Sequence, residues 1–273
     1  MKRSALPRAA VTVVTSALSL ALLTGCGGSG SDDDKSAGAK ASETAAAKAL
    51  SGGELEKLII ATADVDGYKV AAADRSQQFA SSKDDVKVVD EKCTPIAYVL
   101  TGFAPGDSAA YINRQATEVA AKPSASSTKS MEDMTEEELD EAMKGITDAL
   151  GQTLTIVSLS SYEDDGAKKT LSSVSEAIAG CGGGFTATAD GDTQKFTKVE
   201  KEKASGTGDE SLAFAVTGDA DGDKVVVHGE VVRHGSTVAT YYSISLAAFS
   251  GDSDVAAYDI PAAVIKAQAA KLS

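Results

Sequence analysis

The sequence has no tryptophan, and aromatic residues make up only 5% of its 273 residues. With so few large rings, a core must be built mainly from Val, Ile, Leu and Ala, which suit strands and small-residue helices. Basic residues are scarce as well, since 26 Lys and Arg face 40 Asp and Glu and leave a net charge of −14. This sign argues against nucleic acid as a partner and against lying flat on an anionic membrane surface. We expect an acidic, well-solvated surface instead.

Recognisable catalytic motifs are missing too. No G-x-S-x-G nucleophile elbow occurs in the part expected to fold. Ser126 and Lys129 match the S-x-x-K pattern of penicillin-binding enzymes, but they fall in a polar linker and not at the start of a helix. We therefore expect no catalytic residue and no cofactor, and the chain is predicted not to be an enzyme.

One acidic stretch has the spacing of a calcium loop. Four carboxylates match positions 1, 3, 5 and 12 of an EF-hand, namely Asp219, Asp221, Asp223 and Glu230. However, Lys224 stands where that loop needs glycine, and residues 225–227 are a valine run typical of a strand. A hairpin turn at Asp221-Gly222 explains the stretch better, and whether its carboxylates bind a cation stays open.

The only two histidines are also candidate metal ligands. Strand alternation places His228, Glu230 and His234 on one face, but His234 lies further along the strand at a turn. We interpret the three as solvent-facing side chains of a polar sheet face, and no metal site is expected.

The N-terminus carries an export signal. Lys2, Arg3 and Arg8 precede an apolar run over residues 9–23 that is too short to span a bilayer but suits a signal peptide. The run ends in Leu23-Thr24-Gly25-Cys26, which resembles the lipobox of bacterial lipoproteins. That resemblance implies a signal peptide over residues 1–25 and a diacylglycerol on the Cys26 thiol, with a further acyl chain such as palmitate on the new amino group. The alternative is an ordinary secretory signal that leaves Cys26 as a free thiol.

Residues 26–50 are predicted to be the lipidated cysteine and a flexible tether. They consist of Gly, Ser, Ala and charged residues, with almost no core-forming side chain. Such a tether reaches about 25–30 Å, so that the folded part stands clear of the lipid headgroups. The expected location is the outer face of the cytoplasmic membrane, with the lipid on Cys26 as the anchor.

Three cysteines are an odd number for an exported protein. Once Cys26 is assigned to lipid, Cys93 and Cys181 remain, and a disulfide between them is the default in an oxidising compartment. Closing so long a loop should stabilise the fold by about 4–5 kcal/mol in the chain-entropy model. A metal or redox pair is the alternative, but neither a C-x-x-C motif nor a nearby histidine supports it.

The rest of the chain alternates between helical and strand patterns. Apolar spacing and cap residues predict helices beginning at Ser51, at Thr94-Pro95 and at Pro261, and one over residues 166–180. Period-two alternation predicts strands over residues 86–89, 154–162, 196–203, 212–217, 225–232 and 238–246. For residues 51–273 we expect an α+β domain: an antiparallel meander sheet of about five or six strands with helices packed on one face.

Residues 121–150 are predicted to be an insertion in this domain. Their first half is linker-like, and Thr135 and Glu138 then have the spacing of a capping box. The carboxylates that follow are typical of the solvated face of an acidic amphipathic helix.

With these elements placed, residues 51–272 resemble the extracellular sensor domain of PknH-type actinobacterial receptor kinases, which also occurs as stand-alone lipoproteins. The shared features are the opening helix with Leu58-Ile59, Cys93 before a Pro- and Ala-containing helix, the strand at 156–160, and the helix ending at Cys181-Gly182. The meander and the final Pro-led helix complete the order. The resemblance implies a non-catalytic fold with helices on one side of an antiparallel sheet and a ligand-receiving cleft. The family's second cysteine pair is absent, and so is the Trp before Cys181.

The leading hypothesis is a membrane-anchored extracytoplasmic binding or sensor lipoprotein. Its partner would be a small ligand, a peptide or a component of the cell envelope, recognised by the polar sheet face and its flanking loops. The alternative is a lipid or glycolipid carrier, which needs an apolar cavity between sheet and helices. An enzyme is the third possibility, and it requires polar side chains that converge in a pocket.

Overall fold

The computed structural model describes residues 48–73, 80–119, 134–139, 153–220, 222–245 and 258–273, which all belong to one compact unit over residues 45–273. The predicted signal peptide, Cys26 and most of the tether lie outside the described residues, as do Ser126, Lys129, Asp221 and most of the predicted insertion. Within the described residues, no helix is long and apolar enough to cross a membrane.

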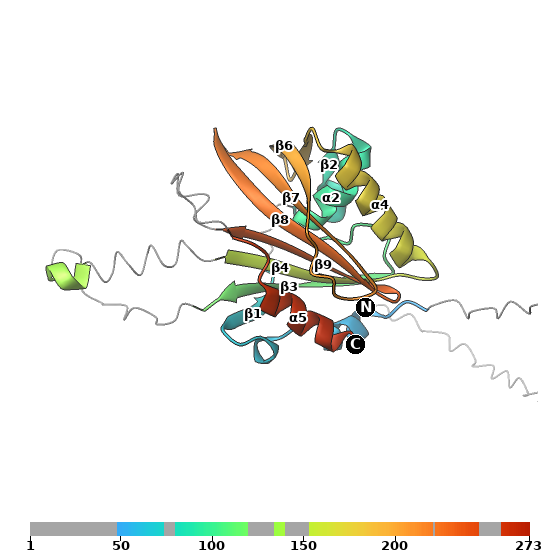
Figure 1. Ribbon diagram of the computed structural model, residues 1–273, viewed down its shortest axis with the longest axis horizontal. Coiled ribbons are helices and arrows are strands. Elements are labelled where there is room, and N and C mark those ends of the chain that lie inside the picture. The colour runs from blue at the N-terminus through green and yellow to red at the C-terminus, as the bar shows by residue number, and fades with distance from the viewer. Residues whose placement is uncertain (1–47, 74–79, 120–133, 140–152, 221, 246–257) are drawn as a thin grey trace, which may run out of the picture. The chain divides into compact units, whose positions relative to one another are not determined.

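A single sheet dominates the fold (Figure 1), and each strand in it is antiparallel to its neighbours. The described residues contribute nine strands in the spatial order β1-β3-β4-β9-β8-β7-β6-β5-β2. Their bounds are β1 Tyr68–Ala72, β2 Lys87–Val88, β3 Ala110–Glu118, β4 Thr153–Ser161, β5 Phe185–Ala189, β6 Asp192–Glu202, β7 Glu210–Ala220, β8 Asp223–His234 and β9 Thr237–Ser245. Strands β5 to β9 form a continuous meander, and β4, β3 and β1 extend it on the β9 side.

Four α-helices that the structure describes from end to end accompany the sheet, and all four were predicted from the sequence. They are α1 Gly52–Leu58, α2 Thr94–Leu100, α4 Gly166–Gly180 and α5 Ala262–Lys271. The Glu54 carboxylate accepts a hydrogen bond from the Ser51 N–H at 2.8 Å, as expected of a capping box. Thr135 and Glu138 make the corresponding pair of bonds, with the Glu138 N–H donating to the Thr135 hydroxyl at 3.3 Å. The start of the predicted acidic helix therefore lies where the sequence places it.

The α+β class fits, but the predicted sheet of five or six strands with helices on one face is wrong. Strands β1, β3 and β5 are additional. Strand β3 carries Asn113, Arg114 and Gln115 at its centre, so that no apolar alternation marks it. Strands β1 and β5 have only five residues each, which gives a periodic pattern little length to show itself.

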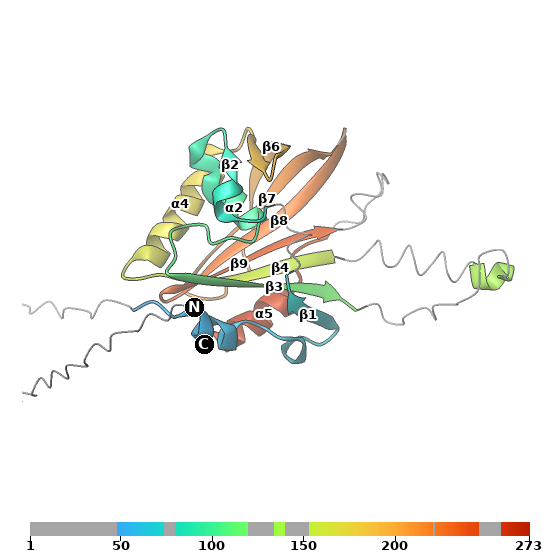
Figure 2. The same cartoon turned by 180° about the vertical axis from the view of Figure 1, so that it is seen from behind.

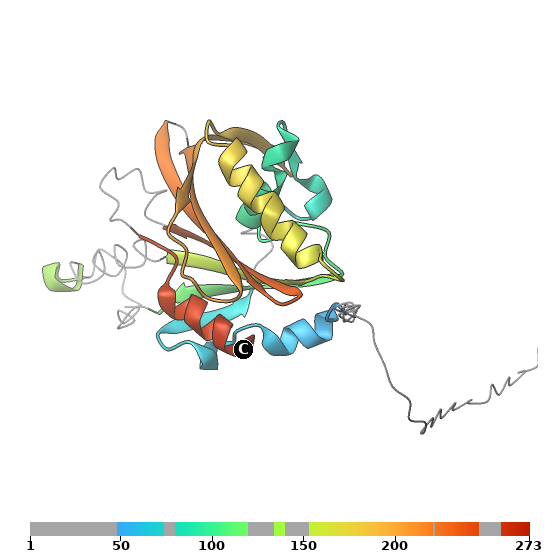
Figure 3. The same ribbon diagram turned by 45° about the vertical axis from the view of Figure 1, so that its right-hand side comes forward.

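Helices cover both faces of the sheet (Figures 2 and 3). On one face, α2 and α4 pack over a core that includes Ile156, Phe214 and Tyr242. On the other, α1 and α5 pack over a second core that includes Val157 and Tyr241. Every residue of β9 is buried as a result. Strand β9 therefore has no solvated face, although its alternation of large and small side chains suggests one.

The disulfide predicted between Cys93 and Cys181 is present, with the two Cα atoms 6.0 Å apart. Cys93 immediately precedes α2, and Cys181 immediately follows α4. The bond therefore ties together the two helices of the first face. Both sulfurs lie in the core beneath these helices, where the cysteines are buried.

Candidate functional site

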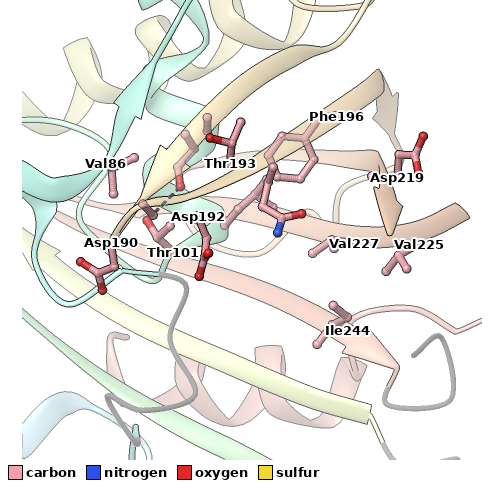
Figure 4. A pocket seen from close by; sticks show the side chains of 16 residues that line it. Val86, Thr101, Asp190, Asp192, Thr193, Phe196, Asp219, Val225, Val227 and Ile244 are labelled. Carbon is pink, nitrogen blue, oxygen red and sulfur yellow. Dashed lines mark hydrogen bonds between the residues drawn. The ribbon is translucent and has the colours of Figure 1, made fainter. Parts of the chain in front are cut away.

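A cleft of about 490 Å³ lies between α2 and the face of the sheet that α2 and α4 cover (Figure 4). Strands β5, β6, β7, β8 and β9 and the segment before β2 contribute to its walls. The lining consists of Val86, Ala97, Leu100, Thr101, Ala187, Ala189, Asp190, Asp192, Thr193, Gln194, Phe196, Gly218, Asp219, Val225, Val227 and Ile244. Aliphatic side chains and one phenyl ring make up its floor, and polar side chains gather along the β5–β6 hairpin.

Two glycines in neighbouring strands differ in the space beside them, and one of the two, Gly218, lines the floor. Phe196 of β6 lies opposite Gly218 of β7, and Phe214 of β7 lies opposite Gly229 of β8. A Cβ atom on Gly229 would come within 2.5 Å of the Phe214 ring, whereas one on Gly218 would lie 3.7 Å from the Phe196 ring. The Phe214 ring therefore fills the space over Gly229, while Gly218 leaves room beside Phe196 that belongs to the cleft.

The position of Phe196 depends on a local irregularity of β6. The register between β6 and β7 shifts after Phe196, as in a β-bulge. On its other side, the Phe196 ring packs against the Phe185 ring with centroids 4.7 Å apart. Gly184, with φ of +87°, lets the chain enter β5 there, because a side chain would collide with the Phe196 carbonyl. The bulge and this close approach together hold the ring at the edge of the cleft.

The acidic rim is built by a tight hairpin. Asp190 and Gly191, which connect β5 and β6, have φ of +51° and +93°, the conformation of a two-residue hairpin turn. The Asp190 carboxylate accepts hydrogen bonds from the Ser81 N–H at 2.7 Å and the Ser81 hydroxyl at 2.9 Å. Asp192 follows the turn, and its side chain points toward the same space as those of Phe196 and Ile244 (Figure 4). The hairpin therefore sets two carboxylates at the mouth of an apolar cleft.

The helical wall comes from α2 and is largely apolar. Ala97 and Leu100 present their side chains from this helix, and both are buried. Thr101 follows them, and its hydroxyl donates to the Ala97 carbonyl at 2.9 Å. Across the cleft, the Thr193 hydroxyl bonds to that of Thr188 at 3.0 Å. Both cleft threonines are therefore engaged with neighbouring chain atoms, which leaves the apolar surface to dominate the site.

His228, Glu230 and His234 are not the solvent-facing side chains that the sequence predicted. Glu230 is only 3% exposed and accepts hydrogen bonds from both the N–H and the hydroxyl of Ser205. Burial raises the pKa of the Glu230 carboxyl, and burial lowers the pKa of His234. His228 Nδ1 lies 2.9 Å from the Glu202 carboxylate. The segments around Ser205 and Tyr258 lie against this face, and the alternation within the strand itself cannot show them.

The acidic stretch around Asp219 forms a hairpin turn. The Asp219 carboxylate accepts a hydrogen bond from the Gly222 N–H at 2.8 Å, which closes the turn between β7 and β8. Asp221 and the side chain of Asp223 lie outside the described residues. In the described part of the chain, no three or more His, Cys, Asp or Glu side chains gather as metal ligands would.

The sequence pointed to a polar sheet face as the recognition surface, and the cleft lies on the opposite face. The second face carries α1 and α5 over β4 and β9, which closes it to a ligand there. One signal in the sequence was available for the cleft. Gly218 interrupts the pattern of β7, and glycine within a strand often marks a close approach or a ligand space.

Comparison with known proteins adds a distant likeness. No protein-family model matches the chain, and no curated protein matches it either. Among solved structures, the chain is similar to the extracellular domain of PknH from Mycobacterium tuberculosis, with a TM-score of 0.45 and 11% sequence identity. The alignment covers 82% of this chain and 95% of that one.

Proposed function

We propose that the chain is a membrane-anchored extracytoplasmic lipoprotein that binds or senses a ligand and catalyses no reaction. The observation that carries the proposal is the cleft of about 490 Å³ between α2 and the sheet. Small-molecule sites have volumes of about 300–1,000 Å³, with apolar walls and a few polar groups that fix orientation. The cleft has this size and this composition.

The non-catalytic part of the proposal rests on how the cleft's reactive groups are engaged. A nucleophilic hydroxyl needs a base within hydrogen-bond reach. The hydroxyl of Thr101 donates to a main-chain carbonyl, and that of Thr193 is bonded to a second threonine. Neither arrangement activates an oxygen. Among the described residues of the lining, the groups able to take a proton are the carboxylates of the rim.

Binding is tested by thermal-shift screening of the purified protein against cell-wall fragments, peptides and small amphiphiles. A bound ligand stabilises the folded state in proportion to the logarithm of its concentration over Kd, so a saturating ligand should raise Tm by several degrees. A flat response across a broad panel, together with no partner in crosslinking from intact cells, would contradict the proposal.

Anchoring is tested separately at Cys26. Labelled palmitate should be incorporated into the chain and should co-purify with the membrane fraction. Cys26→Ser should abolish the label and release the protein, while the nearby Ser29→Ala should change neither. Release of unlabelled native protein into the medium would favour the ordinary secretory signal.

The alternative function, a lipid or glycolipid carrier, is favoured by the apolar floor of the same cleft. A carrier holds its cargo through purification, because an apolar ligand dissociates slowly into water. Native mass spectrometry should then show an added mass that organic extraction removes. An apo mass from cells grown under several conditions would leave the sensor function as the better account.

A further inference from the structure

The charges at the mouth of the cleft share one sign. The charged side chains in its lining are Asp190, Asp192 and Asp219. Among the lining residues that the structure describes, none has a basic side chain. The whole chain, at −14, adds a field of the same sign. An anionic group entering the cleft would therefore be repelled by the rim and by the rest of the protein.

The three carboxylates do not contribute equally. Asp219 is paired in register with Lys195 of β6 and Lys224 of β8, so a lysine stands opposite its negative charge on each neighbouring strand. Asp190 is fixed beside the cleft by the N–H and hydroxyl of Ser81, two neutral donors that leave its negative charge in place. Asp192 projects into the cleft mouth (Figure 4). The field at the mouth comes chiefly from Asp190 and Asp192.

The floor beneath these two carboxylates is apolar. Val225, Val227 and Ile244 line it from β8 and β9, and Leu100 faces them from α2. A ligand gains affinity here by removing aliphatic surface from water. It cannot do so with a charged group, since desolvation of an unpaired ion in this environment is strongly unfavourable. The charge of a ligand must therefore stay at the rim while its apolar part occupies the floor.

We infer that the ligand of the cleft is an amphiphilic cation, in which an amine or quaternary ammonium group is attached to an apolar group. The apolar group lies between α2 and strands β8 and β9, and the cation lies at the β5–β6 hairpin beside Asp190 and Asp192. This inference rests on the proposed function, because it names the chemical class of ligand for the same cleft.

Three probes with the same ten-carbon chain separate the contribution of charge from that of the apolar chain. They are decylamine, decan-1-ol and decanoate, titrated by calorimetry into the purified full chain at pH 7 below their aggregation limits. An exposed carboxylate changes the affinity of a unit charge by about two-fold to five-fold. With two carboxylates, decylamine should bind at least about ten-fold more tightly than decanoate, with decanol between them. Salt at about 0.5 M should reduce the difference in affinity between decylamine and decanoate.

Two variants locate the binding. Asp192→Asn should weaken the binding of decylamine by about two-fold to five-fold and leave the binding of decanol unchanged. Asp66→Asn, which removes an exposed carboxylate in a turn outside the cleft lining, is the matched control and should change neither. Gly218→Leu adds a side chain from a strand position where the first carbon has room, and it should weaken all three probes.

The outcomes distinguish this inference from the function on which it rests. Binding of decanol or decanoate as tightly as decylamine, lost in Gly218→Leu, would overturn the cationic ligand and keep the cleft as a binding site. Equal affinities of Asp192→Asn and native protein for decylamine would also overturn it. Failure of all three probes to bind at any concentration up to their aggregation limits, or binding that a folded Gly218→Leu variant retains in full, would count against the cleft itself.

Discussion

At the scale of single residues, two glycines in similar settings have opposite tolerance for a side chain. Each lies inside a strand and opposite a phenylalanine of the neighbouring strand. The Phe214 ring covers Gly229 so closely that a methyl group there would have to displace it, whereas Gly218 has ordinary contact distances on all sides. Protein interiors are packed densely enough for this difference to be felt in stability.

Gly229→Ala should lower the free energy of unfolding by about 1–3 kcal/mol, because the fully buried Phe214 ring must leave its place in the core. Gly218→Ala is the matched control and should be neutral or slightly stabilising, since alanine restricts the unfolded chain more than glycine does. Urea denaturation of the two variants measures the difference. Equal losses in both would show that backbone conformation at these glycines, and not the aromatic contact, decides their identity.

At the scale of elements, a buried amide joins the first and last helices of the domain. Gln268 of α5 is fully buried, and its side-chain nitrogen donates to the Leu58 carbonyl at 2.8 Å. Its side-chain oxygen accepts from the Ile60 N–H at 3.0 Å. The Leu58 carbonyl is a group that α1 leaves without a helical partner where it ends, and the Ile60 N–H lies just beyond that end. One glutamine therefore caps α1 and fixes α5 beside it.

Gln268→Leu should lower the free energy of unfolding by about 2–4 kcal/mol, because it leaves a buried N–H and a partly buried carbonyl without partners while keeping a similar side-chain volume. Lys266→Leu puts the same side chain on the exposed face of α5 and should stay within about 0.5 kcal/mol of the native protein. Thermal and urea unfolding give both values. A loss as small as that of the control would mean that water reaches Leu58 and Ile60 in the variant.

The edges of the sheet are closed by local devices. Strand β1 is one edge, and the Thr62 hydroxyl both donates to the Val70 carbonyl and accepts from the Val70 N–H, each at 3.0 Å. The other edge is β2, which is only two residues long. An open edge strand is a template for pairing with another chain. The short length of β2 and the hydrogen bonds from Thr62 to β1 therefore reduce the opportunity for such pairing.

Elements with strong local signals could be predicted from the sequence, and relations between elements could not. The helices, the strands β6 to β9 and the cysteine pair follow from periodicity, caps and an odd cysteine count. The second covered face was missed because β9 places small and polar side chains there, such as Ser243. Its hydroxyl is satisfied across the sheet by the Thr155 hydroxyl at 2.7 Å, a partner 88 residues away. Alternation within one strand cannot reveal such a partner.

The same limit applies to the cleft. Its lining comes from α2, from five strands and from the segment before β2, so that no contiguous stretch of sequence contains it. Gly218, which interrupts the pattern of β7, was the local sign of it. The sign of its charge, by contrast, agrees with a composition in which Asp and Glu outnumber Lys and Arg by 40 to 26.

At the scale of the whole molecule, three ionisable groups whose pKa values folding shifts make stability depend on pH in opposite directions. Burial lowers the pKa of His234, so the unfolded chain takes up a proton before the folded protein does as the pH falls below about 6.5. The stability that His234 contributes is therefore lost as the pH falls below that value. Hydrogen bonding from Gly235 and the nearby Arg233 lower the pKa of Asp209, which adds a loss at still lower pH. Burial raises the pKa of Glu230, and Asp259 adds to that shift. Glu230 therefore acts against the other two.

The contribution of Glu230 can be isolated with Glu230→Gln, which keeps an oxygen to accept from Ser205 but cannot ionise. The folded protein holds the Glu230 proton to higher pH than the unfolded chain does, so native stability from this group is present at low pH and lost as the pH rises through the folded-state pKa. The free energy of unfolding of the variant should therefore rise relative to that of the native protein from pH 4 to pH 8, by about 1.4 kcal/mol for each unit by which folding raises the pKa. Urea unfolding across this range measures the gain, with Glu176→Gln on the exposed face of α4 as the control for removing a carboxylate. A constant difference between native protein and Glu230→Gln would mean that the two Ser205 hydrogen bonds hold the carboxylate ionised despite its burial.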